Sequence, residues 1–185
     1  MRKISVALFI AMLSTLFTTR INAQEETTQQ INWMTWEEAV AAQEQEQKKL
    51  LVNVYTGWCR WCKRMDETTF KQPKIAEYLN QYFYPVKLDA EHKENIEFQG
   101  EVFKYVKSGN KGYHELAAKL MRGRLSFPSI VFMDENLEVI QALPGFKTPG
   151  EFEQIITYFA QDHYKSTPWT SFLKSYKPIL VSDKH

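Results

Sequence analysis

The run Leu50–Tyr55 constrains the fold of this chain more than any other segment. It is short, almost entirely apolar and rich in β-prone residues, a composition typical of a strand buried in the middle of a sheet. Patterns with helical spacing come before and after it. Strands that alternate with helices predict a sheet with a parallel portion and helices on both faces.

The rest of the chain continues this alternation. Thr35 and Glu38 form a capping box, which predicts a helix over residues 36–48. Asp134-Glu135-Asn136 is expected to join two strands as an antiparallel hairpin. The fold class is therefore predicted to be α/β, a three-layer α/β/α architecture with a central mixed sheet. Further helices are expected over residues 74–82, 96–107, 113–121 and 149–163, and further strands over residues 84–88, 129–133 and 137–143.

Residues 1–23 have the pattern of a secretory signal peptide. Arg2 and Lys3 give a basic start, residues 4–17 form an almost unbroken apolar run, and Ala23 is a small residue suited to cleavage. A membrane-spanning helix needs about 20 apolar residues, so this run is short for a permanent anchor; an uncleaved anchor is the alternative. We therefore expect a bacterial protein that is periplasmic or otherwise exported and leaves the membrane when its signal is cleaved.

The charge of the mature chain argues against one class of partner. Loss of the signal peptide removes three basic residues and no acidic one, so the formal net charge changes from +1 to −2. A nearly neutral chain without a basic stripe binds nucleic acid poorly, because such binding depends on neutralising phosphates. No nucleic-acid partner is expected.

The mature chain is expected to contain one domain, over residues 33–163, preceded by a polar leader over residues 24–32. A helical insertion is predicted within it at about 93–125. Residues 164–185 form a C-terminal extension with a short amphipathic segment, which we expect to dock on the domain; binding to a partner is the alternative. The apolar residues of that segment are Trp169, Phe172, Leu173 and Tyr176.

Cys59 and Cys62 are the only cysteines, and two residues separate them at the junction between a strand and a helix. In a helix that begins near Cys59, the sulfur of this residue faces unpaired amides and the positive end of the helix dipole. Arg60 and Lys63 add positive charge, and such surroundings can lower a thiol pKa from ~8.5 toward 3.5–7.5. We predict that Cys59 is the reachable nucleophile and that Cys62, buried one turn deeper, resolves the mixed disulfide.

Three other interpretations of the cysteine pair stay open. A structural disulfide is one, although a loop of four residues restricts little chain entropy. A zinc site is the second, although the chain has no second cysteine pair and its four histidines are scattered. Chance spacing of two inert cysteines is the third, and the flanking run Trp-Cys-Arg-Trp-Cys-Lys argues against it. No metal and no organic cofactor are expected.

With these motifs the chain resembles the thioredoxin superfamily. More narrowly, it is similar to exported bacterial thioredoxin-like proteins whose active-site run reads Trp-Cys-x-x-Cys-Lys. The resemblance covers about residues 36–159 and implies a thioredoxin-like fold. The resemblance rests on four features of the sequence: the strand 51–55, the motif 58–63, Phe127-Pro128-Ser129 before a strand, and Gly145 after the last strand.

The resemblance also implies a surface that binds substrate. In the family, the proline that aligns with Pro128 follows a cis peptide bond and lies beside the cysteine pair. The backbone of Phe127 would then pair with an extended substrate segment, and Pro128 would keep metals away from the thiols. Trp58 and Trp61 complete this predicted surface. The alternative is that Pro128 merely opens an edge strand.

Two features of the chain depart from the family. Thioredoxins carry a buried Asp in the central strand that helps to move the proton of the resolving cysteine, whereas this chain has Asn53, which cannot titrate. Either Glu67, Asp66 or water takes its place, or proton transfer is less assisted. The dipeptide Arg60-Trp61 also differs from those of thioredoxins and of strong oxidants, so the family does not fix the direction of electron transfer.

The resemblance implies an exported thiol-disulfide oxidoreductase that acts on protein disulfides or thiols through the Cys59–Cys62 pair, more as a reductant than as an oxidant. A membrane or periplasmic redox partner would restore the pair. The alternative is a non-catalytic binding module on a thioredoxin-like scaffold. In that case Trp58, Trp61 and Phe127 form an apolar patch for a protein partner.

Overall fold

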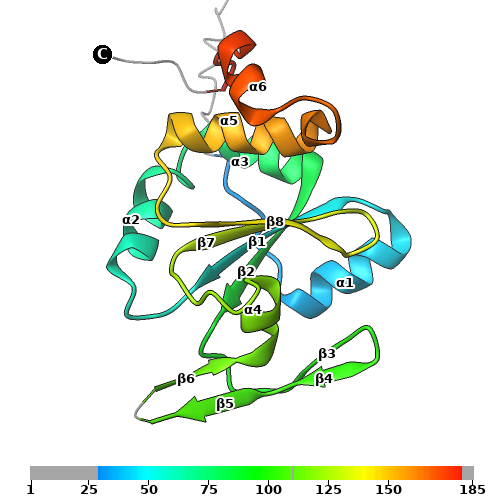
Figure 1. Cartoon of the computed structure of the whole chain (residues 1–185), viewed down its shortest axis with the longest axis vertical. Helices are drawn as coiled ribbons and strands as arrows, with labels where there is room; N and C mark the ends of the chain where they lie inside the picture. The colour runs from blue at the N-terminus through cyan, green and yellow to red at the C-terminus, as the bar shows by residue number, and fades with distance from the viewer. Residues whose placement is uncertain (1–28, 110, 181–185) are drawn as a thin grey trace, which may run out of the picture.

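A four-stranded mixed sheet lies at the centre of the molecule (Figure 1). The computed structural model describes residues 29–109 and 111–180. β1 is parallel to β2 and antiparallel to β7, and β7 and β8 form the antiparallel hairpin. The predicted central strand and the mixed sheet are therefore confirmed. The strands are β1 (Lys49–Tyr55), β2 (Phe83–Asp89), β7 (Ser129–Met133) and β8 (Val139–Pro144), in the order β2-β1-β7-β8.

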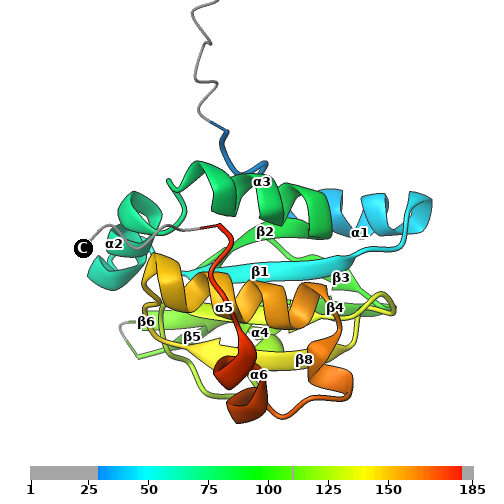
Figure 2. The same ribbon diagram turned by 90° about the horizontal axis from the view of Figure 1, so that it is seen from above.

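Helices cover both faces of this sheet. α3 and α5 lie on one face, and α1 and α4 lie on the other (Figure 1, Figure 2). The arrangement confirms the three-layer α/β/α architecture, and the Thr35 capping box begins α1 as predicted. The helices are α1 (Trp36–Gln45), α2 (Arg60–Thr68), α3 (Pro73–Tyr82), α4 (Glu115–Leu120) and α5 (Pro149–Ala160).

The side chains of the central strands alternate between two apolar cores. Leu51 and Phe132 belong to the core under α3 and α5, whereas Val52 and Val131 belong to the core under α1 and α4. All four side chains are fully buried. Because both faces of β1 are covered in this way, the strand carries the near-continuous apolar run seen in the sequence.

The predicted helical insertion at 93–125 is wrong over most of its length. Two short antiparallel hairpins replace it, and α4 is its helical part. Ile96 and Phe98 are buried while Glu97 between them is exposed, so the apolar residues alternate with a period of two. Gly100, at a φ of 77°, makes the first turn possible. The hairpins consist of β3 (Ile96–Phe98) with β4 (Glu101–Phe103) and of β5 (Tyr105–Ser108) with β6 (Lys111–His114).

The C-terminal extension docks on α5, as predicted. A 3-10 turn, η1 (His163–Lys165), leads into α6 (Trp169–Ser175). Phe172 of α6 is buried, with its ring centroid 5.0 Å from that of Tyr158 in α5. The carboxylate of the buried Glu153 accepts hydrogen bonds from the Tyr176 hydroxyl and from the Leu180 amide. These contacts hold the extension against α5.

The predicted signal peptide, residues 1–23, lies outside the described residues. Within residues 29–109 and 111–180, no helix is long and apolar enough to cross a membrane. The domain boundaries expected from the sequence stay predictions.

Phe132 offers a test of the core under α3 and α5. Its ring stacks on that of Phe159 at a centroid distance of 4.1 Å. We expect Phe132→Ala to lower the free energy of unfolding by about 3–5 kcal/mol, because it removes buried apolar area and leaves a cavity. Urea unfolding with the disulfide intact measures this change. Val102→Ala, at an exposed position of β4, is the control and should change stability by less than about 0.5 kcal/mol. A loss no larger for Phe132→Ala than for the control would contradict this account of the core.

Candidate functional site

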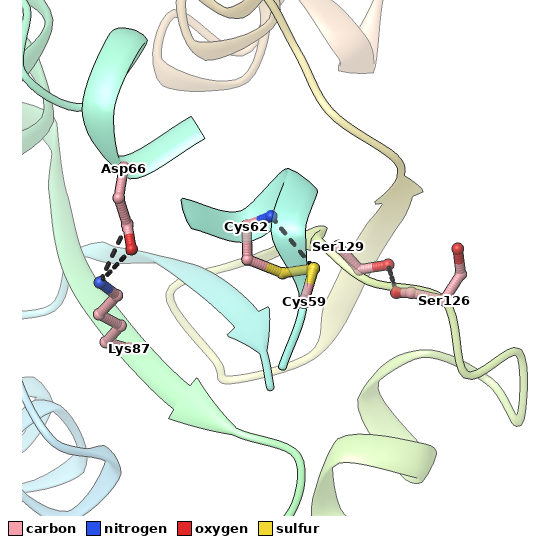
Figure 3. Close-up of a disulfide and its surroundings, with 6 residues drawn as sticks. All are labelled: Cys59, Cys62, Asp66, Lys87, Ser126 and Ser129. Carbon is pink, nitrogen blue, oxygen red and sulfur yellow. Dashed lines mark hydrogen bonds and ion pairs between the residues drawn. A yellow bond between two sulfur atoms is a disulfide. The ribbon is translucent and has the colours of Figure 1, made fainter. Parts of the chain in front are cut away.

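Cys59 and Cys62 form a disulfide across the first turn of α2 (Figure 3). Cys59 is the N-cap of this helix, and its Sγ accepts a hydrogen bond from the backbone N–H of Cys62 at 3.1 Å. The Cα atoms of the pair lie 5.3 Å apart. The expectation that a helix begins near Cys59 and that the sulfur faces its first-turn amides is therefore confirmed.

The two cysteines do not differ in exposure, although the sequence analysis expected a reachable Cys59 above a buried Cys62. Each retains only 4% of its accessible surface. The disulfide holds the two sulfurs together across the first turn of α2, so both cysteines share one buried environment.

Aromatic side chains flank the pair. Trp58 and Trp61 are 58% and 59% exposed, and they point to different neighbours. The ring of Trp58 meets that of Phe127 edge-to-face with centroids 6.0 Å apart, whereas Trp61 lies 5.4 Å from Phe146 after β8. The structure therefore brings Trp58 and Phe127 together and directs Trp61 toward a second aromatic side chain that the sequence analysis did not identify.

The Phe127–Pro128 peptide bond is cis, as the resemblance implied. In the sheet register, Ser129 at the start of β7 is opposite Val54 near the end of β1. This pairing carries the Pro128 segment to the sheet edge where the chain leaves β1 for the cysteine turn, and Figure 3 shows Ser129 beside Cys59. The Pro128 carbonyl accepts a hydrogen bond from the Gly145 amide at 2.7 Å, which fixes the segment.

A pocket of about 400 Å³ lies beside Trp58 and Phe127. The β5–β6 hairpin supplies much of its wall, and the Lys111 ammonium lies 5.0 Å from the centre of the Trp58 ring. This pocket was not expected from the sequence, because helices were predicted where the hairpin forms. The alternation of apolar and polar residues at Ile96-Glu97-Phe98 was the signal available for strands in this region. The lining residues include Thr56, Glu91, Lys111, Tyr113 and Leu125.

Arg60 and Lys63, the predicted thiolate-stabilising residues, are exposed on the first turn of α2. Neither forms an ion pair with another residue of the described part of the chain. Any stabilisation of a thiolate by these two side chains would be a longer-range electrostatic effect. This role stays a prediction. Among the described residues, no group of three or more His, Cys, Asp or Glu side chains could hold a metal ion.

The position expected to hold an acid is occupied by Asn53, which is buried. Of the two candidate acids on α2, Glu67 is exposed, whereas both carboxylate oxygens of Asp66 lie 2.9 Å from the Nζ of Lys87. Lys87 is opposite Asn53 in the register of β1 and β2. Burial raises the pKa of the nearby Tyr55, and the charges of Asp89 and Asp66 raise it further.

A family model matches residues 21–166 of the chain; the family is Thioredox_DsbH, described as a protein of unknown function, DUF255. An uncharacterized Caenorhabditis elegans protein, B0495.5, is 26% identical over 120 residues, which is 56% of this chain and 16% of that protein. The chain spans less than a fifth of the length of each curated relative it matches.

Solved structures share the fold. A thioredoxin-fold protein from Helicobacter pylori superposes with a TM-score of 0.54 at 19% identity, over 69% of this chain and 79% of that one. A structure described as DsbH oxidoreductase superposes with a TM-score of 0.50 at 15% identity, over 72% and 85% of the two chains. The resemblance to the thioredoxin superfamily is thereby confirmed at the level of fold.

The capping geometry predicts unequal acidity for the two thiols after reduction. We expect Cys59 to ionise well below the ~8.5 of an ordinary thiol, because the first-turn amides and helix dipole stabilise its thiolate. The pH dependence of iodoacetamide alkylation, followed at each cysteine by peptide mass mapping, measures this. In a variant that carries Arg60→Gln and Lys63→Gln, the Cys59 thiol should ionise at a higher pH than in the wild-type protein if these two charges contribute. Alkylation of both cysteines with the profile of an ordinary thiol would contradict the prediction.

Proposed function

The chain belongs to the Thioredox_DsbH family, and from the geometry of its site we propose that it is a thiol-disulfide oxidoreductase acting on protein substrates. The observation that carries this proposal is the disulfide placed across the N-terminus of α2, with Cys59 Sγ as the cap. A structural bridge needs no such position. A redox pair does, because a thiolate must form at one of its sulfurs.

The exchange takes place in two steps. The Cys59 thiolate attacks a substrate disulfide, so that a Cys59–substrate bond forms, the substrate bond breaks and one substrate sulfur leaves as a thiolate that takes up a proton. The Cys62 thiol then loses its proton and attacks Cys59. The Cys59–Cys62 bond forms, and the second substrate sulfur leaves. The substrate gains two electrons and two protons, and the pair is oxidised; the reverse steps oxidise a dithiol.

The exposed aromatic side chains support binding of a polypeptide at this site. Trp58 and Phe127 form one wall of the 400 Å³ pocket, and the β5–β6 hairpin forms another. We expect the backbone of Phe127, before Pro128, to pair with an extended substrate segment in the manner of strand addition. Cys59 is 4% exposed in the disulfide-bonded pair, so we expect neighbouring side chains to shift when a substrate sulfur approaches.

The proposal includes export and net reduction. The apolar N-terminal run and its small residue before Gln24 support secretion, and a membrane or periplasmic redox partner would return electrons to the pair. The cysteines carry the electrons themselves, so the proposed reaction uses no metal or organic cofactor.

One observation favours a second candidate function. Trp58 and Trp61 are large apolar side chains with more than half of their surface exposed, as in a protein-docking patch. A non-catalytic binding module would use this patch and leave the disulfide unreacted. The two functions differ in whether the cysteines are needed.

Substitution of each cysteine tests the proposed reaction. We expect Cys59→Ser to abolish reduction of insulin disulfides by the pre-reduced protein, because no nucleophile is left. Cys62→Ala should instead accumulate mixed disulfides with cellular proteins, because the resolving thiol is missing; non-reducing gels and mass spectrometry detect them. Full activity of Cys59→Ser, or the absence of trapped proteins on Cys62→Ala, would reject the mechanism.

A further inference from the structure

The β5–β6 hairpin places a basic segment beside the cysteine pair. Residues 102–114 contain three lysines and no acidic residue. Two of these lysines, Lys107 in β5 and Lys111 in β6, are exposed. Neither forms an ion pair with any other residue that the structure describes. Their charges are therefore available to a partner that binds at this hairpin.

The Lys111 side chain reaches from β6 to the residue before the predicted nucleophile. Its ammonium lies 5.0 Å from the centre of the Trp58 ring, and Trp58 directly precedes Cys59 in the chain. A cation over an aromatic face is attracted by the electrons of the ring, so this contact holds the ammonium at the pocket beside Trp58 and Phe127. A carboxylate that enters the pocket can pair with Lys111 without breaking another ion pair.

Two further segments next to the site are basic. Arg60 directly follows Cys59, and Arg124 directly precedes Leu125, which lines the pocket. Both arginines are exposed, and within residues 29–109 and 111–180 neither belongs to an ion pair. Among the described lining residues, Glu91 is the one acidic side chain. The whole chain has a formal net charge of only +1, so positive charge is concentrated near this site.

The pocket offers both apolar and polar contacts to an incoming side chain. Trp58 and Phe127 give it apolar walls. The hydroxyl of Thr56, which also lines it, is buried and has no hydrogen-bond partner in the described part of the chain. Because a buried hydroxyl without a partner costs free energy, a polar occupant is favoured. The methylene groups of a glutamate can pack against the two rings while its carboxylate accepts hydrogen bonds from Thr56 and Lys111.

We propose that the β5–β6 hairpin selects protein substrates in which glutamate or aspartate flanks the reacting cysteine, and that Lys111 recognises the carboxylate. This inference rests on the proposed oxidoreductase function and names a class of substrate for it. Opposite charges raise the rate at which two molecules meet in a productive orientation, and like charges suppress it. Lys111 thus acts on the approach of the substrate and takes no part in the transfer of electrons.

Three peptides that differ only beside their single cysteine test this selection. The cysteine is flanked on both sides by glutamate, glutamine or lysine and carries 5-thio-2-nitrobenzoate in a disulfide bond. The Cys59 thiolate of the pre-reduced full-length protein attacks the peptide sulfur, a Cys59–peptide disulfide forms, and the coloured thiolate leaves. We expect the glutamate peptide to react about 10-fold faster than the glutamine peptide at low salt, the lower end for electrostatic steering. This advantage should shrink at about 1 M salt, which screens charges beyond about 3 Å.

Charge variants assign the selection to Lys111. The ratio of the rate with the glutamate peptide to the rate with the glutamine peptide should approach one in Lys111→Gln and fall below one in Lys111→Glu. Taking the ratio within each variant cancels any change in the reactivity of Cys59. Lys174→Glu is the control and should keep the wild-type ratio. This residue is exposed on α6, at the other end of the molecule from β5 and β6 (Figure 1).

The reaction of each peptide with 2-mercaptoethanol, a neutral thiol, corrects for differences in the reactivity of the peptides themselves. After this correction, the same ratio in the wild-type protein and in Lys111→Glu would overturn the inference. A faster reaction of the wild-type protein with the lysine peptide than with the glutamate peptide would also overturn it. If the protein reacts with all three peptides no faster than 2-mercaptoethanol does, the proposed function itself fails. Equal acceleration with all three leaves that function standing and removes only the inference.

Discussion

The hydrogen bond from the Cys62 amide to Cys59 Sγ is the interaction on which the geometry of the site depends. It makes a sulfur atom the N-cap of α2, a place usually taken by the oxygen of Ser, Thr, Asp or Asn. A cap at this position faces the partial positive charge of the helix terminus, so negative charge on the sulfur is stabilised. This helix terminus follows the buried strand β1 after a short turn. The strand therefore fixes the position of Cys59 in the structure.

The sheet register brings the other parts of the site to that point. Ser129 is opposite Val54, which carries Phe127 and the cis Pro128 to the cysteine turn, and Lys87 is opposite Asn53, which carries an ammonium to Asp66. Cys59 and Asp66 belong to α2, Phe127 precedes β7 and Lys87 belongs to β2, so segments far apart in the chain meet here. Strand pairing in one sheet places the segments that carry Phe127 and Lys87.

Local patterns in the sequence predicted much of the fold and the place of the cysteine pair at a helix N-terminus, because strand β1, the Thr35 cap and the β7–β8 hairpin are determined by neighbouring residues. The insertion was predicted as helices because the alternation of Ile96, Glu97 and Phe98 covers only three residues, a run too short to identify a strand from the sequence. The small exposure of Cys59 was missed because it depends on packing around the disulfide, which neighbouring residues in the sequence do not determine. The ion pair of Asp66 required the register between β1 and β2, which no single segment encodes.

The reduction potential of the Cys59–Cys62 pair tests the central claim most directly. It is measured by equilibrating the full-length protein in glutathione and dithiothreitol redox buffers and quantifying the oxidised fraction by alkylation and mass spectrometry. A pair that exchanges electrons with protein substrates should have a potential between about −270 and −120 mV, the range of known redox-active dithiols. A potential below about −300 mV, typical of structural disulfides in secreted proteins, would contradict the account.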